Sequence, residues 1–455
     1  MPELVPHRRI HVVGAGGAGM SGLAKILAQA GHTVTGSDLK PAASLSSLAA
    51  AGVETWVGHR PAAASSWDLV VASSAVPDRD PEVQAAREAG VAVWGRPRLL
   101  EALTKKMGTI GVTGTHGKTS GTAMLVTALR SLGRDPSFMV GGELVGVGTN
   151  AHLGETGLFA LEADEAFGTF LSLDLTGLVV TNVEPDHLDH YGSLEDLESA
   201  FVEVVGSVDG PVVACLDDPG AAGVARRAEN VTGYGTSRDS PWRITGIGHR
   251  PGGVSFRLTW PHGEVDVDVP KPGVHVARNA SGVLALLGEM GFDVAGAAAG
   301  LSRFAGVRRR FETRARIDGV VVIDDYAIHP TEIRATIEAA RLGGAARTVA
   351  VFQPHRFTRT AEMGAELGEA LAGAKRVFVT DVYAASEAPI PGVTGRVVAA
   401  AADAAGAEVT YVPRRADLAA AVAAEARAGD LILLMGAGDI TLVADELPPL
   451  LAGDG

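Results

Sequence analysis

The stretch IHVVGAGGAGMSGLAKILAQA, residues 10–30, has the pattern of a β-strand, a glycine-rich turn and an α-helix. An apolar run precedes the spacing GxGxxG at residues 14–19, and a helix is predicted from Met20 to Ala30. Asp38 follows the next predicted strand, residues 33–35. In such a unit the turn and the helix N-terminus bind a diphosphate, and the acidic residue binds a ribose hydroxyl. The pattern therefore predicts a Rossmann-like nucleotide-binding unit.

The same alternation continues along the chain. Short runs rich in Val and Ile alternate with Ala/Leu-rich helical stretches, which is typical of parallel sheets covered by helices, so the fold class is predicted to be α/β. Because 455 residues are about three times a usual ~150-residue domain, two to four domains are expected. The predicted strands are residues 10–13, 69–72, 110–113, 158–161, 179–181, 320–323, 349–352, 377–380 and 431–435.

One segment, between Pro241 and Pro270, departs from this pattern. Apolar residues alternate with polar ones over residues 254–260 and again over 265–269, and Pro261-His262-Gly263 lies between the two runs. Alternation on both sides of a short turn predicts a β-hairpin. A small antiparallel insertion is therefore expected in the middle of the chain.

The composition excludes several classes of protein. A net charge of -14 disfavours nucleic-acid binding, because it repels a phosphate backbone. The single cysteine, Cys215, excludes an intrachain disulfide and a cysteine-based zinc site, and fits a reducing cytoplasm. No run approaches the ~18 apolar residues needed to span a bilayer, so no membrane association is expected. The chain has 58 glycines, about 13% of its residues against a usual ~7%. This excess indicates low complexity or many close approaches of backbone to ligand.

A second glycine loop, Gly114-Thr115-His116-Gly117-Lys118-Thr119-Ser120, also lies between a predicted strand and helix. It is similar to a phosphate-binding P-loop, although the spacing is shorter than GxxxxGK[ST]. Backbone N–H groups would hold phosphate oxygens, Lys118 would reach the terminal phosphates, and Thr119 or Ser120 could ligate Mg²⁺.

The two loops together leave the ligands open. Separately they indicate NAD and ATP. The first loop can equally bind the diphosphate of a nucleotide-linked substrate, because its amides recognise diphosphate rather than nicotinamide.

Carboxylates and histidines follow two predicted strands near the second loop. Glu162-Ala163-Asp164-Glu165 follows one, and Glu184-Pro185-Asp186-His187-Leu188-Asp189-His190 follows the other. The histidines favour Zn²⁺, whereas a neighbouring P-loop favours Mg²⁺ with one or two protein ligands. A solvated polar turn is the alternative.

Arginines gather in two places towards the C-terminus. Arg308, Arg309 and Arg310 precede a strand that ends in Asp324-Asp325-Tyr326. Arg356 and Arg359 lie three residues apart at a predicted helix start, a spacing that suits a carboxylate ligand because guanidinium groups bind carboxylates in a bidentate way. The alternative for each group is a solvated basic turn.

Taken in order, these motifs resemble the Mur ligase family over essentially the whole chain. The matching stretches are residues 14–22, 114–120, 162–165, 181–187, 324–326 with 329–330, 353–356 and 381–389. The resemblance implies three domains: a Rossmann-like UDP-sugar domain at 1–106, a P-loop ATPase domain at 107–314 and a Rossmann-like amino-acid domain at 315–455. It also implies ATP- and Mg²⁺-dependent joining of L-alanine to UDP-N-acetylmuramate in the cytoplasm, by a monomer or homodimer.

The resemblance also implies roles for individual residues. The UDP-sugar would contact Gly14, Gly16, Gly17, Gly19, Met20, Asp38, Ser73 and Ser74. ATP would contact Gly114, Thr115, His116, Gly117, Lys118, Thr119, Ser120, Asn279, Arg310 and Asp324. Mg²⁺ would be ligated by Thr119, Glu162 and His187, and the catalytic residues would be Lys118, Glu162, His187 and Arg310. The amino acid would contact Tyr326, His329, His355, Arg356 and Arg359.

Three positions differ from the family pattern. Ile328 stands where the family usually has a histidine that contributes to binding the amino acid, Ala166-Phe167 replaces a common Ser-Asp pair, and Val276 replaces a usual Asn. Ile328 leaves open a family member that couples a different amino acid or carboxylate. An NAD-dependent oxidoreductase, which needs only the first loop, and a non-catalytic UDP-sugar sensor are the alternatives from other classes.

Overall fold

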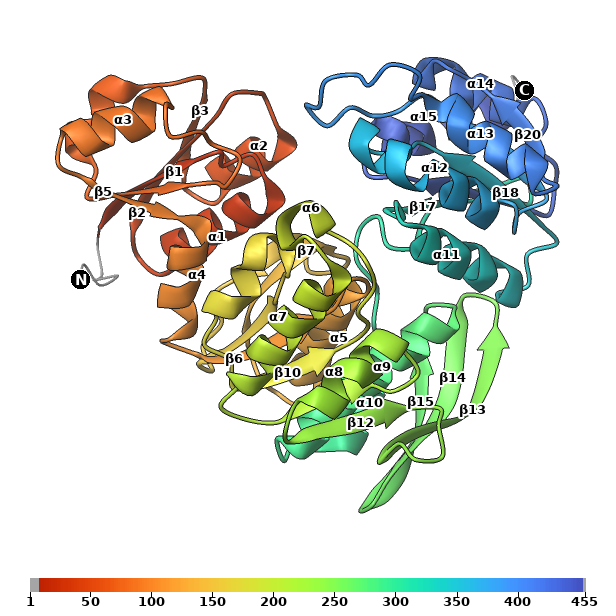
Figure 1. Cartoon of the computed structure of the whole chain (residues 1–455), viewed down its shortest axis with the longest axis horizontal. Coiled ribbons are helices and arrows are strands. Elements are labelled where there is room, and N and C mark those ends of the chain that lie inside the picture. Colours follow the sequence, from red (N-terminus) through yellow and green to blue (C-terminus); the bar gives the residue numbers. More distant parts are fainter. Residues whose placement is uncertain (1–7, 453–455) are drawn as a thin grey trace. The chain divides into compact units, whose positions relative to one another are not determined.

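The computed structural model describes residues 8–452 (Figure 1). The described residues form two compact units, the first from residues 8–245, 257–267 and 278–305 and the second from 246–256, 268–277 and 306–452. Three sheets, of five, ten and six strands, carry the architecture. The predicted α/β class with three sheet-based domains is confirmed.

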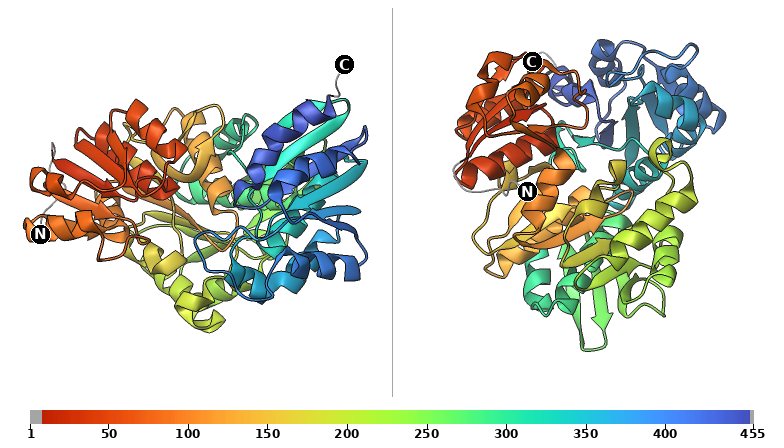
Figure 2. Two further views of the ribbon diagram at one scale, coloured as in Figure 1. Left: turned by 90° about the horizontal axis from the view of Figure 1, so that it is seen from above. Right: turned by 60° about the vertical axis from the view of Figure 1, so that its left-hand side comes forward.

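The first sheet is parallel and has the strand order β3-β2-β1-β4-β5. Ile10 and Val12 of β1 pack into one core with Leu23 of α1, whereas Val13 packs into a second core with Val83 of α3, so helices cover both faces (Figure 2). The elements are β1 (Arg9–Val13), α1 (Ala18–Gln29), β2 (Thr33–Asp38), α2 (Ala43–Ala50), β3 (Glu54–Val57), β4 (Leu69–Ala72), α3 (Pro81–Glu88), β5 (Ala92–Gly95) and α4 (Arg96–Thr104).

The second sheet has the order β15-β14-β13-β12-β11-β10-β6-β9-β7-β8. Strand β6 lies inside the sheet, with β10 and β9 parallel on either side. The strands are β6 (Gly108–Thr113), β7 (Ser137–Leu144), β8 (Thr149–His152), β9 (Leu158–Glu162), β10 (Gly177–Val180), β11 (Val212–Cys215), β12 (Val231–Gly235), β13 (Trp242–Arg250), β14 (Gly253–Trp260) and β15 (Gly263–Val269). The helices are α5 (Lys118–Ser131), α6 (Leu188–Tyr191), α7 (Leu194–Gly206), α8 (Pro219–Arg227), α9 (Val274–Glu289) and α10 (Val294–Leu301).

The third sheet has the order β16-β17-β21-β18-β19-β20 and is parallel except at β16. Apolar residues on both faces of its central strands form two cores. Its elements are β16 (Glu312–Ile317), β17 (Val320–Asp325), α11 (Pro330–Leu342), β18 (Arg347–Phe352), α12 (Phe357–Leu371), β19 (Arg376–Val379), α13 (Gly395–Ala404), β20 (Glu408–Tyr411), α14 (Leu418–Ala423), β21 (Asp430–Met435) and α15 (Val443–Leu451).

The predicted strands and the predicted hairpin are confirmed, with small differences at their ends. Asp38 is the last residue of β2 rather than a residue beyond it, and α1 begins at Ala18, two residues before the predicted start. Nine of the described strands were not predicted: β3, β5, β7, β8, β11, β12, β13, β16 and β20. In β13 only part of the sequence alternates. No helix within residues 8–452 is long and apolar enough to cross a membrane.

Candidate active site

The first glycine loop, which follows β1, is held by residues at the ends of β2 and β4, the two strands on either side of β1. The N–H groups of Gly14 and Ala15 both donate to Ser37 O at 2.9 Å, and the N–H of Gly16 donates to Asp38 Oδ2 at 2.9 Å. Gly14 has φ +80°, and a Cβ there would lie 2.9 Å from the Cβ of Ser73. Asp38 therefore braces the loop, and Ser73 lies directly beside it.

The remaining residues predicted for this ligand lie around the start of α1. Gly17 is the N-cap of the helix and has no capping side chain, and Met20 is buried in the core beneath. Ser74 is exposed just beyond β4. Helix N-terminal N–H groups without a capping side chain can bind an anion.

Arg96 is a residue of this region that the sequence analysis missed. A Cβ on Gly19 would lie 3.2 Å from the central guanidinium carbon of Arg96, so the cation lies against the loop. Its Nε is buried and has no hydrogen-bond partner among residues 8–452. Arg96 is 77 positions from Gly19, and no local pattern links the two.

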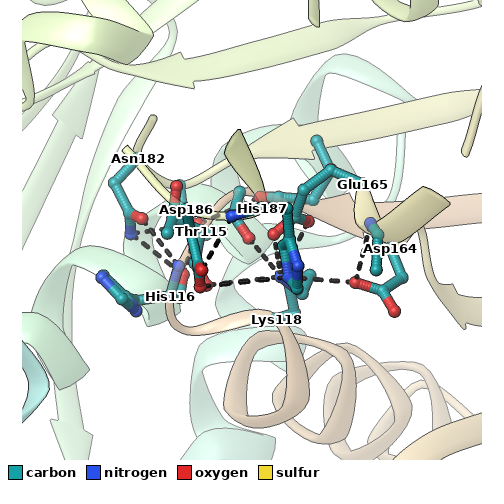
Figure 3. Close-up of polar contacts among 12 residues, drawn as sticks. Thr115, His116, Lys118, Asp164, Glu165, Asn182, Asp186 and His187 are labelled. Carbon is teal, nitrogen blue, oxygen red and sulfur yellow. Dashed lines mark hydrogen bonds and ion pairs between the residues drawn. The ribbon is translucent and has the colours of Figure 1, made fainter. Parts of the chain in front are cut away.

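The second glycine loop is held by the segment that follows β10. Asn182 Oδ1 accepts the N–H of His116 at 2.7 Å, and Asn182 Nδ2 donates to His116 O at 2.9 Å (Figure 3). Thr181 Oγ1 donates to the same carbonyl at 2.7 Å. A Cβ on Gly114, which has φ +130°, would lie only 2.2 Å from Thr181 Oγ1. Asn182 and Thr181 therefore fix the loop, a role that the sequence analysis did not assign to them.

Asn279 lies on the other side of this loop. A Cβ on Gly117, which has φ +85°, would lie 2.9 Å from both polar atoms of the Asn279 amide. Gly117 is also the N-cap of α5, so the amide side chain lies at the helix N-terminus. Thr115 Oγ1 accepts the N–H of Glu184 at 2.9 Å, which ties the loop to a further residue of the segment after β10.

Lys118 is bound inside its own loop and to a carboxylate. Its Nζ donates to Gly114 O at 2.7 Å and to Glu165 Oε1 and Oε2 at 2.7 and 2.8 Å (Figure 3). Asp164 lies farther away, with an Nζ to Oδ1 distance of 3.6 Å. The sequence places Glu165 near the loop, but its direct pairing with Lys118 was not predicted.

Burial opposes the charge on both partners of this pair. Burial alone would lower the pKa of Lys118, but the carboxylates of Glu165 and Asp164 outweigh it and raise that pKa above its usual value. Burial raises the pKa of Glu165, and Lys118 offsets this only in part. Lys118 is therefore a firmly charged ammonium at neutral pH.

Two oxygen donors converge beside Gly141 of β7. The N–H of Gly141 donates to Glu162 Oε1 at 2.5 Å. A Cβ on Gly141 would lie 3.0 and 3.1 Å from the two Glu162 oxygens and 3.1 Å from Thr119 Oγ1. Carboxylate and hydroxyl oxygens are the ligands that Mg²⁺ prefers, so Thr119 and Glu162 fit this ion. Ser120, the alternative hydroxyl, is half-buried one residue further on.

Gly141→Ala is expected to lower Mg²⁺-dependent activity by roughly tenfold to a hundredfold, because the new methyl group would displace Glu162 or Thr119. The measurement is the Mg²⁺ concentration needed for half-maximal ADP formation. Gly146→Ala, in open space but at φ +83°, controls for glycine loss in the same region. An unchanged Mg²⁺ requirement in the Gly141 variant would show that these oxygens do not serve the ion.

His187 lies at the start of the short helix α6. Its backbone is left-handed, with φ +54°, and its N–H donates to Asp186 Oδ1 at 2.8 Å. Its ring Nε2 is 3.9 Å from Asp186 Oδ2. His190 packs edge-on against Tyr191, and the side chain of Asp189 lies outside the described residues. The left-handed backbone of His187 is strained for a residue other than glycine, which indicates a constrained role.

In the second unit, Arg310 and Arg309 both lie over the ring of Tyr326, at 4.9 and 5.2 Å from its centroid. Arg309 also donates to Gly436 O at 2.6 Å, so it anchors the turn after β21. Asp324 is fully buried and accepts hydrogen bonds from Arg314 at 3.2 Å and from Thr441 at 2.5 Å.

The predicted amino-acid residues lie at the carboxyl ends of β17 and β18. Arg356 has φ +71° and ψ 138°, a conformation that costs a non-glycine residue ~1–3 kcal/mol, and its Nε lies 3.1 Å from Glu387 Oε1. The ring of His355 stacks on Tyr383, and burial beside Arg359 and Arg356 lowers the pKa of His355 to about 4. His355 is therefore neutral at physiological pH, and the cations here are arginines.

His329 has a structural role that the sequence analysis did not foresee. Its side chain is the N-cap of α11, and Glu332 completes a capping box with it. Ile328, immediately before it, is half-buried and donates its N–H to Glu332 Oε2 at 3.0 Å.

Three profiles of Mur ligase domains match the chain in order. The profile described as Mur ligase family, catalytic domain, matches residues 9–107. The Mur ligase middle domain matches residues 112–287, and the profile described as Mur ligase, glutamate ligase domain, matches residues 309–438.

Relatives of known name match over nearly their full length. The UDP-N-acetylmuramate--L-alanine ligase of Mycolicibacterium vanbaalenii is 43% identical over 97% of this chain and 95% of its own. The enzyme of the same name from Kineococcus radiotolerans is 44% identical over 98% and 96%. The solved UDP-N-acetylmuramate-alanine ligase of Thermotoga maritima has a TM-score of 0.84 at 28% identity, covering 97% and 98%. The chain therefore belongs to the Mur ligase family.

Proposed function

We propose that this chain joins L-alanine to the lactyl carboxylate of UDP-N-acetylmuramate, with conversion of ATP to ADP and phosphate, in peptidoglycan precursor synthesis. The observation that carries the proposal is the second glycine loop, in which Gly114 O and Glu165 hold Lys118, while oxygens of Thr119 and Glu162 converge near Gly141. The near-full-length match to ligases of that name supports the substrates. The proposed domains are residues 1–106 for the UDP-sugar, 107–314 for ATP and 315–455 for the amino acid.

The chemistry takes place in two balanced steps. The substrate carboxylate attacks the γ-phosphorus of ATP, an acyl phosphate forms and ADP leaves, while Lys118 neutralises charge on the transferring group. The alanine amine then attacks the acyl carbon, loses a proton and expels phosphate. Mg²⁺ held by Thr119, Glu162 and His187 would supply further charge neutralisation. Arg310 would stabilise the γ-phosphate.

The amino acid is proposed to bind in the second unit, near Tyr326, His355, Arg356 and Arg359. Guanidinium groups bind carboxylates in a bidentate way, so Arg356 and Arg359 would hold the alanine carboxylate. Asn279 and Asp324 are proposed to contact the adenosine.

The test is phosphate release by the purified chain with ATP, Mg²⁺, UDP-N-acetylmuramate and one of alanine, serine or glycine. Release that depends on alanine and on the UDP-sugar, with formation of the amide product by mass spectrometry, is expected. No alanine-dependent release would overturn the proposed substrate.

A second candidate is a family member that couples a different amino acid, and Ile328 favours it. This residue places an apolar side chain where the family usually has a histidine. Release with serine or glycine in preference to alanine in the same assay would support this candidate.

Arg96→Ala is expected to raise the KM for UDP-N-acetylmuramate by roughly tenfold to a hundredfold, because the buried Nε of Arg96 lies at the first glycine loop and would pair with the diphosphate. Steady-state kinetics with varied UDP-sugar measure the change. Arg98→Ala is the matched control, since Arg98 stacks on Trp94 at 4.8 Å. A similar KM for both variants would show that Arg96 does not contribute to UDP-sugar binding.

A cytoplasmic location fits the single cysteine and the nucleotide substrates. A monomer or a homodimer remains the prediction for the oligomeric state, without nucleic-acid or membrane partners.

A further inference from the structure

The ammonium group of Lys118 has no hydrogen-bonding capacity left in this structure. Its Nζ lies within hydrogen-bonding distance of Gly114 O at 2.7 Å, Thr115 O at 3.3 Å and the two Glu165 oxygens at 2.7 and 2.8 Å. An ammonium carries three protons, so these four acceptors already use them all. A phosphate oxygen that binds Nζ must therefore replace one of the four.

The two carbonyl acceptors are fixed by the loop itself. Gly114 packs directly against the segment that follows β10, because Thr181 Oγ1 and Asn182 O would lie 2.2 and 2.7 Å from a Cβ built on it. The N–H of Thr115 donates to Asn182 O at 3.1 Å. Both carbonyls are thus part of a rigid cradle and cannot be the acceptors that leave.

The backbone of Glu165 is anchored by hydrogen bonds to its carbonyl oxygen. Glu165 O accepts the Tyr191 hydroxyl at 2.5 Å and the N–H of Gly168 at 2.9 Å. The backbone is therefore held, so only the side-chain torsions of Glu165 can move its carboxylate away from Lys118. The carboxylate pairs with the Lys118 ammonium, the group to which the proposed function assigns the ATP phosphates (Figure 3).

We propose that Glu165 competes with the phosphates of ATP for Lys118 and so sets the affinity of the chain for ATP. The inference rests on the proposed function, which places ATP phosphates at Lys118. Two anions cannot share this buried ammonium without strong repulsion, so binding of ATP requires the Glu165 side chain to turn away. Glu165 is in this sense an affinity-determining residue that keeps the charge of Lys118 paired within the protein.

The test is calorimetric titration of the full chain with a non-hydrolysable ATP analogue and Mg²⁺. Glu165→Gln is expected to bind the analogue about tenfold more tightly than wild type, since a charge-assisted hydrogen bond no longer has to be broken. Asp164→Asn is the matched control. It removes the same charge near Lys118, but from an Nζ to Oδ1 distance of 3.6 Å, and a change of less than about threefold is expected.

Thermal unfolding gives a second readout. Without nucleotide, Glu165→Gln should melt below wild type, because buried Lys118 loses its counter-ion, and the analogue should raise its melting temperature more than that of wild type. If Glu165→Gln does not fold, Glu165→Asp, with a shortened side chain, must also bind the analogue more tightly than wild type.

Equal or weaker binding by the folded Glu165 variant would overturn the inference. An equal increase in affinity for the analogue in the Asp164 and Glu165 variants would also overturn it, since such an increase would reflect net charge alone. No binding by wild type would instead overturn the proposed ATP site, so the two failures are distinguishable.

Discussion

Replacing Lys118 by methionine is expected to lower alanine-dependent phosphate release by roughly a thousandfold or more. Methionine keeps much of the aliphatic length and removes the ammonium. Lys118 is the cation that Gly114 O and Glu165 hold at the second glycine loop, and its raised pKa keeps it charged. Without it, negative charge on the transferring phosphoryl group is neutralised by one cation fewer. The measurement is single-turnover phosphate release at saturating ATP.

Loss of folding must be separated from loss of chemistry in this variant. Lys118→Met leaves the Glu165 carboxylate buried without its partner, which destabilises a protein strongly. The double variant Lys118→Met with Glu165→Gln removes both charges and should recover stability without recovering activity. Lys25→Met, at a half-buried lysine whose Nζ donates to Asn150 Oδ1 at 3.1 Å, is the control. Near-normal release by the folded double variant would exclude a role for Lys118 in phosphoryl transfer.

The Glu82→Ala variant is expected to destabilise the first sheet by roughly 3–5 kcal/mol. The Glu82 carboxylate is fully buried and accepts hydrogen bonds from Trp56 Nε1 at 3.0 Å, the N–H of Arg60 at 2.7 Å and Ser37 Oγ at 2.5 Å. Its Oε2 also lies 3.3 Å from Nε2 of His11, which is buried too. Alanine leaves these donors without an acceptor in the core.

Hydrogen exchange of the β1 and β2 amides measures this loss, because it reports the opening free energy of that sheet alone. Glu88→Ala, at the exposed end of the same helix, is the matched control and should change little. Equal protection of β1 and β2 in the two variants would show that the Glu82 network adds nothing to stability.

The contribution of Glu82 should also depend on pH. Burial alone would raise the pKa of Glu82, but hydrogen bonds from His11, Ser37 and the N–H of Arg60 lower it to about 2. The folded value thus lies below the ordinary 4.5, so the stabilising effect is complete above about pH 4.5 and is lost as the pH falls towards 2. The difference in protection between wild type and Glu82→Gln should therefore shrink over that range.

Local patterns predicted the α/β class, twelve of the 21 described strands and the two phosphate loops. The loop at residues 14–19 and the loop at 114–120 could be located because each depends on residues next to one another in the chain. In these loops Gly14 and Gly117 adopt φ near +80°, which only glycine does at little cost. The β14–β15 hairpin was predicted from alternation, and β13 was missed where alternation is incomplete.

The sequence by itself determined the α/β class, the glycine loops and the family, because these rest on short-range periodicity and on residues adjacent in the chain. The tertiary structure alone brought Glu165 to Lys118, Gly141 to Glu162, and Arg96 to Gly19. The first two pairs depend on the order of the second sheet, in which β6 lies between β10 and β9, and β7 lies beyond β9. The third depends on the order of the first sheet, in which β4 lies between β1 and β5. Strand order is set by packing of the whole sheet against its helices, and no periodicity along the chain records which strand becomes the neighbour of which.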